Sequence, residues 1–104
     1  MSIATIDIQP RVDRVEFNND LLTVYIQDGR IVSVPIRWYP RLERATIKEQ
    51  KEWRVFQDTD GRDILFWESL DELIPMVALL TGVPSRESKH SLGRWLSERK
   101  SKGT

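Results

Sequence analysis

The chain has 104 residues, of which 39% are hydrophobic and 31% charged, and it contains no cysteine. That length allows one domain with one core, and the lack of cysteine excludes disulfides, thiolate metal sites and cysteine nucleophiles. No apolar run approaches the roughly 20 residues of a membrane-spanning helix, and the first residues lack the basic region of a signal peptide. We therefore expect a cytoplasmic protein that does not enter a membrane.

The net charge is +0, but the two signs are unevenly distributed along the chain. Residues 83–104 contain six basic and two acidic side chains, a net +4, whereas residues 1–82 contain ten basic and fourteen acidic ones, a net −4. Such segregation indicates that the tail contacts either the body or a partner of its own. We predict a lead-in at 1–11, a single domain at 12–82 and a basic tail at 83–104 that is helical or disordered.

Alternating apolar residues predict a meander of three strands. The first begins at Val12 and ends at the turn residues 18–20. The second covers 21–27, and the Asp28-Gly29 dipeptide that follows favours a two-residue hairpin. A third strand then returns over 31–36.

The chain changes from strand to helix within residues 34–42. Pro35 cannot donate to a strand ladder, so it marks an edge or the end of pairing. Pro40 suits the first turn of a short helix. Thr46 and Glu49 have the spacing of a capping box, which predicts that a second helical turn begins there.

Two further strands, at 53–56 and 64–67, are expected to pair through the turn at 58–61 and to extend the first sheet. The segment 69–72 has a second capping-box spacing, and a helix is expected from about Pro75 to a cap at Gly82. The predicted fold class is α+β: a small antiparallel β-sheet of about five strands, rich in hairpins, with two or three short helices packed on it and a basic C-terminal tail. The core is expected to contain three tryptophans, Trp38, Trp53 and Trp67.

No arrangement of residues indicates catalysis. His90, the only histidine, lies in the polar tail without the further ligands of a zinc site or the partners of a catalytic triad. The aspartates of the 58–63 turn lack the spacing of a calcium loop. Asp71 and Glu72 are interpreted as helix-opening acids rather than as an acid–base pair. We expect no catalytic residue, no metal, no cofactor and no enzymatic activity.

Arginine and aromatic residues gather in two places, around 37–44 and in the tail. The first group is suited to phosphates or an acidic protein surface, although its arginine stems could instead cover a core aromatic. The tail has one apolar turn around Trp95, which would allow it to bind nucleic acid, to fold on a partner, or to fold back on the acidic body. An exposed Trp95 and a free meander edge would also suit a homodimer. The candidate partner-binding residues are Arg37, Tyr39, Arg41, Arg44, Arg94, Trp95 and Arg99.

The stretches Pro40-Arg41-Leu42…Ala45-Thr46 and Trp67…Leu70-Asp71, within a match from about Val12 to Gly82, resemble the bacterial domain-of-unknown-function family 2442 (DUF 2442). The resemblance implies a small α+β domain with no established enzymatic activity. Members are often encoded beside a protein of another uncharacterised family, number 4160, in an arrangement that looks like a toxin–antitoxin pair. Some relatives carry a C-terminal helix-turn-helix domain. The 22 residues after Gly82 are too few for one, which argues against operator binding by the tail.

Two functional hypotheses follow. The first is a non-catalytic protein-interaction module, the antitoxin-like member of a bacterial two-gene pair, whose protein partner is encoded nearby. The second is a small nucleic-acid-binding transcriptional regulator that uses Arg37, Arg41 and the basic tail.

Overall fold

The computed structural model describes residues 9–102, so most of the predicted lead-in lies outside the described part of the chain. The strands are β1 (Val12–Asn18), β2 (Leu21–Ile26), β3 (Ile31–Pro35), β4 (Arg54–Gln57), β5 (Asp63–Trp67) and β6 (Glu72–Pro75). The α-helices are α1 (Pro40–Glu43), α2 (Ile47–Lys51), α3 (Met76–Thr81) and α4 (Lys89–Lys102). Two short 3₁₀ turns, η1 (Ile36–Trp38) and η2 (Glu68–Leu70), each follow a strand.

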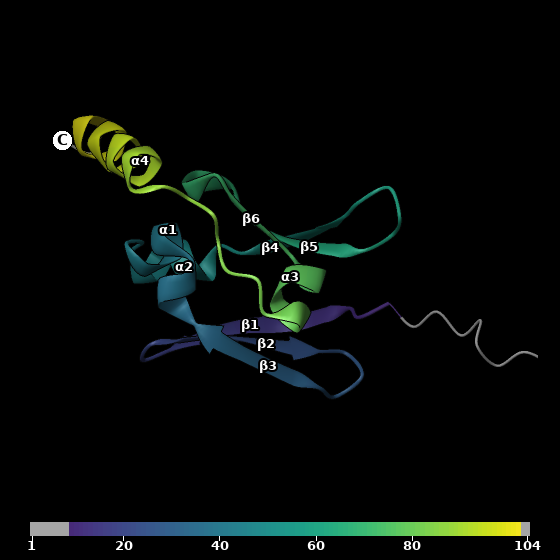
Figure 1. The fold of residues 1–104 in the computed structure, drawn as a ribbon. Helices are drawn as coiled ribbons and strands as arrows, with labels where there is room; N and C mark the ends of the chain where they lie inside the picture. The colour runs from purple at the N-terminus through teal and green to yellow at the C-terminus, as the bar shows by residue number, and fades with distance from the viewer. Residues whose placement is uncertain (1–8, 103–104) are drawn as a thin grey trace, which may run out of the picture.

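The strands form two antiparallel sheets, in the orders β1-β2-β3 and β4-β5-β6. Figure 1 shows the first sheet along the lower side of the molecule and the second above it, with α1 and α2 at one end. The predicted α+β class is confirmed, and the strands form hairpins as expected. The prediction that β4 and β5 extend the first sheet is wrong, because they pair with β6 in a sheet of their own.

The inner faces of both sheets supply the core. In β2 every second side chain is buried, with Leu22, Val24 and Ile26 at most 3% exposed. The opposite sheet contributes Trp67, which is fully buried and meets the ring of Phe17 edge-on at a centroid distance of 6.2 Å. Such aromatic pairs are favourable beyond the area that they bury. The other two predicted core tryptophans, Trp38 and Trp53, are partly buried against this cluster.

Asp63 joins the two sheets through its side chain, which is 4% exposed. Its carboxylate accepts a hydrogen bond from the backbone N–H of Val12 at 2.9 Å and another from the Arg11 guanidinium, also at 2.9 Å. Because an unpaired buried carboxylate would be costly, these donors explain why an acid is tolerated there. Asp63, the first residue of β5, therefore has a structural role: it connects that strand to the start of β1.

The turns and caps follow the local sequence closely. Gly29 has a φ of +100° within the loop 27–30, which is longer than the predicted two-residue turn. Thr46 and Glu49 form both hydrogen bonds of the predicted capping box at the start of α2. Gly82 caps α3 in the left-handed conformation, with a φ of +75°.

The segment 69–72 does not open a helix, contrary to the prediction. Asp71 adopts a left-handed conformation with a φ of +53° after η2, and Glu72 begins strand β6. Neither acid lies in the first turn of a helix, so the proposed interaction with a helix dipole is wrong. Helix α3 begins only after Pro75, as the proline itself indicated.

Beyond α3 the chain crosses the molecule and ends in α4. The Ser85 backbone N–H donates to the Trp38 carbonyl at 3.0 Å, which fixes the direction of this connection. Figure 1 shows α4 at the periphery, beside α1 and the end of the β4-β5-β6 sheet that carries η2. Of the alternatives left open for the tail, the structure has a helix over 89–102.

Candidate functional site

Three of the predicted partner-binding residues, Arg41, Trp95 and Arg99, come together where α4 meets the body. The Arg41 guanidinium donates from Nε and Nη2 to the Glu87 carboxylate, with bonds of 2.8 and 2.7 Å. It also donates to the carbonyls of Leu70 and Asp71, both at 3.1 Å. Five N–H groups are the whole capacity of a guanidinium, so Arg41 has little left for an external ligand.

Trp95 completes this contact from the helix side. Its side chain is 8% exposed and belongs to the core cluster. The guanidinium carbon of Arg41 lies 5.2 Å from the ring centroid, and that of Arg99 lies 4.5 Å from it, within the range of cation–π attraction. The expectation of an exposed Trp95 is therefore wrong, since the ring is used within the chain. We call Arg41, Glu49, Glu87, Trp95 and Arg99 the α4 latch.

Arg99 forms the second ion pair of the α4 latch. It binds Glu49 through two bonds of 2.8 Å, a bidentate geometry. The hydrogen bonds from Arg99 lower the pKa of Glu49 to about 2, and the bond from Arg41 lowers the pKa of Glu87. Glu49 in the body and Glu87 in the tail are thus both charged at neutral pH, and each pairs with an arginine of the other segment.

The remaining predicted residues are not part of the α4 latch. Tyr39 is 3% exposed, and its hydroxyl donates to the Val83 carbonyl at 3.2 Å. Burial raises the pKa of Tyr39 to about 12. Arg37, Arg44 and Arg94 are exposed and form no ion pair with the described residues. The seven predicted residues therefore do not form one site.

Sequence reasoning missed a second surface, the uncovered face of α3. The helix reads Met-Val-Ala-Leu-Leu-Thr and has no charged side chain. Only Met76 and Leu79 are buried, while four large apolar side chains on and around the helix stay exposed: Leu73 (52%), Val77 (51%), Leu80 (38%) and Val83 (40%). We call these four residues the α3 patch. The signal in the sequence was the absence of any polar face on this helix.

A hollow of about 270 Å³ opens at one side of the α3 patch, where Leu73 and Val83 line it. Leu73, Ala78 and Val83 contribute apolar walls, and Tyr39, Glu72 and Arg86 contribute polar groups. We call it the Glu72 hollow. The Glu72 carboxyl forms no hydrogen bond and no ion pair with any of residues 9–100. This is the one carboxyl in the described part of the chain whose pKa is raised to about 7.

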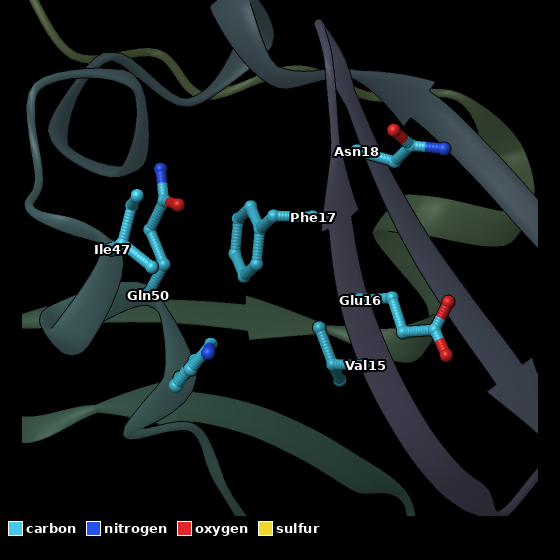
Figure 2. Close-up of a pocket in the computed structure, with 7 residues that line it drawn as sticks. Val15, Glu16, Phe17, Asn18, Ile47 and Gln50 are labelled. Atoms are coloured by element: carbon cyan, nitrogen blue, oxygen red, sulfur yellow. The ribbon is translucent and has the colours of Figure 1, made fainter.

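A larger hollow, of about 390 Å³, separates β1 from α2. Figure 2 shows Phe17 in the middle of this space, facing Ile47 and Gln50 across it, while Glu16 points away from α2. The lining contains no hydroxyl or thiol, and its one carboxyl, that of Glu16, points away from α2. Within the described residues, no group of three or more histidine, cysteine, aspartate or glutamate side chains is placed to hold a metal ion. His90 is exposed on α4.

Comparisons with known proteins place the chain in a family. The model of the family described as "Protein of unknown function (DUF2442)" matches residues 12–85. A crystal structure of a protein of unknown function from Rhodospirillum rubrum is similar in fold, with a TM-score of 0.59 and 22% identity over 77% of this chain and 95% of that one. No curated protein matches the sequence. None of the helices within 9–102 has both the length and the apolar composition needed to cross a bilayer. Because the family model spans most of the sequence, the chain belongs to the DUF2442 family.

Proposed function

We propose that this protein is a non-catalytic protein-interaction module, and that a partner protein binds over the α3 patch. The observation that carries the proposal is the exposure of four large apolar side chains around one short helix. Scattered exposed apolar residues are normal, but a contiguous group marks a contact surface. Leu73 and Val83 line one hollow, Val77 and Leu80 line the next, and α3 joins the two.

The chemistry of the α3 patch favours a protein over a nucleic acid as its occupant. Phosphate groups need cations, and the patch itself consists of leucine and valine. Apolar anchors are the groups that interfaces between proteins bury. The proposal extends to an antitoxin-like role, in which the partner is the product of a neighbouring gene and both proteins act in the cytoplasm.

The test is co-expression of the full chain with its neighbouring gene product, followed by purification through a tag on the partner. We expect a stoichiometric complex, and we expect the double variant Val77→Asp/Leu80→Asp to weaken it at least tenfold. Ile31→Asp is the matched control, because Ile31 is also exposed and apolar (59%) but lies in the first sheet. No complex with the native chain, or equal losses in both variants, would contradict the proposal. Light scattering of the chain alone shows whether a second copy covers the patch instead.

A second candidate function, nucleic-acid binding, is supported by the three exposed arginines Arg37, Arg44 and Arg94. The other two basic candidates are committed to ion pairs, Arg41 with Glu87 and Arg99 with Glu49. Three phosphate contacts would give a salt slope of about −3 in a double-logarithmic plot. Fluorescence anisotropy with duplex DNA between 50 and 200 mM salt measures that slope. Binding unchanged by alanine at all three arginines would remove this candidate.

A further inference from the structure

Glu72 is a carboxyl in a partly buried site without a partner of opposite charge. It lies at the start of β6, and its side chain lines the Glu72 hollow. The charge of Arg41 lowers the pKa of Glu72, but its guanidinium is already engaged by Glu87 and by two backbone carbonyls. A charge that is taken out of water and left unpaired is unfavourable. Glu72 is thus a partly buried carboxyl of this surface that the fold leaves without an ionic partner.

Charged groups of both signs act on the Glu72 carboxyl. Burial raises the pKa of Glu72 to about 7, Arg41 opposes that rise, and the charges of Glu87 and Asp71 add to it. Tyr39 lines the same hollow, and the negative charge of Glu72 contributes to the raised pKa of the Tyr39 phenol. Arg86 lines the same hollow but is exposed and forms no ion pair with Glu72. A positive charge brought next to the ionised Glu72 carboxyl would therefore be stabilised there.

The walls and the size of the hollow restrict what can bring that charge. Apolar groups of Leu73, Ala78 and Val83 line the same hollow as the carboxyl. A volume of about 270 Å³ is at or below the lower end for pockets that hold small-molecule ligands, roughly 300 Å³. Lysine and arginine combine an apolar stem with a cationic head, which matches apolar walls that lead to a carboxylate.

We infer that the Glu72 hollow is an anchor site for one lysine or arginine side chain of a partner protein that also covers the α3 patch. This inference rests on the proposed function, since Leu73 and Val83 belong to both the hollow and the patch. The stem of the incoming side chain packs between those two residues, and its head replaces the missing counter-ion of Glu72. Burial of a charged pair at the centre of an apolar contact is typical of residues that dominate binding.

The probe for this site is n-butylguanidinium, with N-butylurea as its neutral counterpart of similar shape. The full chain is labelled at the methyl groups of leucine and valine and at the carboxyl carbon of glutamate, and it is titrated with each compound by NMR. We expect saturable shifts at Leu73, Val83 and the Glu72 carboxyl with the cation only. Because Glu72 must be ionised, the affinity for the cation should fall about tenfold from pH 8 to pH 6.

Two variants decide the role of the carboxyl. Glu72→Gln should abolish the preference for the cation, whereas Glu68→Gln, which removes an exposed carboxyl from the adjacent turn, should leave it unchanged. Equal shifts with butylurea, no saturable shift, or an unaltered titration of the Glu72→Gln protein would overturn the inference. If the titration fails but the complex with the partner protein forms, the anchor site alone is refuted. Loss of the complex in every form, with the titration as expected, would refute the proposed function and keep the cation site.

Discussion

Replacement of Arg41 by alanine measures how much the α4 latch contributes to stability. The substitution removes the bidentate bonds to Glu87, the bonds to the carbonyls of Leu70 and Asp71, and one cation against the Trp95 ring. The Glu87 side chain is only 9% exposed. Its carboxylate would then lie without a counter-ion in a place that water reaches poorly.

The expected loss follows from the burial of this pair. Removing one partner of a fully buried ion pair costs about 3–5 kcal/mol. The Arg41 side chain is 15% exposed, and the Glu87 carboxylate of the variant can be protonated or can turn toward solvent. We therefore expect the free energy of unfolding to fall by a smaller amount, about 2–3 kcal/mol. For a domain of this size that corresponds to a decrease in melting temperature of roughly 10–20 °C.

The assay is thermal and urea unfolding of the full chain at pH 7, followed by circular dichroism. Arg44→Ala is the matched control, because Arg44 lies at the end of the same helix, is exposed and forms no ion pair with the described residues. Its free energy of unfolding should change by no more than about 0.5 kcal/mol. Hydrogen exchange of α4 amides detects release of the helix without global unfolding. Native-like protection in α4, together with equal stabilities of the two variants, would refute the reasoning.

Three more predictions concern buried or shifted groups. Trp67→Ala should lower the free energy of unfolding by about 3–5 kcal/mol, since the ring is fully buried, and urea denaturation that shows less than about 1 kcal/mol would contradict that assignment. Glu49, with its pKa lowered to about 2, stabilises the fold above its unfolded pKa of about 4.5, and that contribution is lost as the pH falls toward 2. In urea denaturation at pH 2–5, the free energy of unfolding should therefore depend less on pH in Glu49→Gln than in the native chain. For Glu72 the dependence on pH is reversed, because its folded pKa of about 7 lies above its unfolded value of 4.5. The contribution of Glu72 to the free energy of unfolding is fully present below pH 4.5 and declines as the pH rises to 7. Glu72→Gln should remove that decline, and an unchanged profile between pH 5 and 8 would count against a partly buried, unpaired Glu72.

Local signals in the sequence were sufficient for the strands of the first sheet and for the caps at Thr46 and Gly82. Alternation in β2, a positive φ at Gly29, the Thr46 capping box and the left-handed Gly82 all depend on residues close to one another in the chain. The second sheet could not be assigned in the same way. Its third strand, β6, has only four residues and ends at a proline, and the spacing of Ser69 and Glu72 imitates a capping box. A short apolar run of this kind does not distinguish strand from helix.

The α4 latch lay beyond sequence reasoning for another reason. Arg41 and Glu87 are 46 residues apart, and Glu49 and Arg99 are 50 apart, so no local pattern links them. The arginines around 37–44 appeared equivalent as a cluster, but packing distinguishes them: Arg41 is engaged and Arg44 is exposed. The segregation of charge between an acidic body and a basic tail did indicate contact of the kind that Glu49 and Arg99 make, but it did not indicate the Arg41–Glu87 pair, in which the tail supplies the acid.

The hydrogen bond from Ser85 to the Trp38 carbonyl has an architectural consequence. It fixes the point and direction of departure at the boundary where the family match ends. Any segment joined there is delivered to the same corner of the molecule, whatever its sequence. Exchange of the chain after Ser85 would remove Glu87, Trp95 and Arg99, so a module fused at this point has to replace both ion pairs of the α4 latch and the cover that Trp95 gives the core.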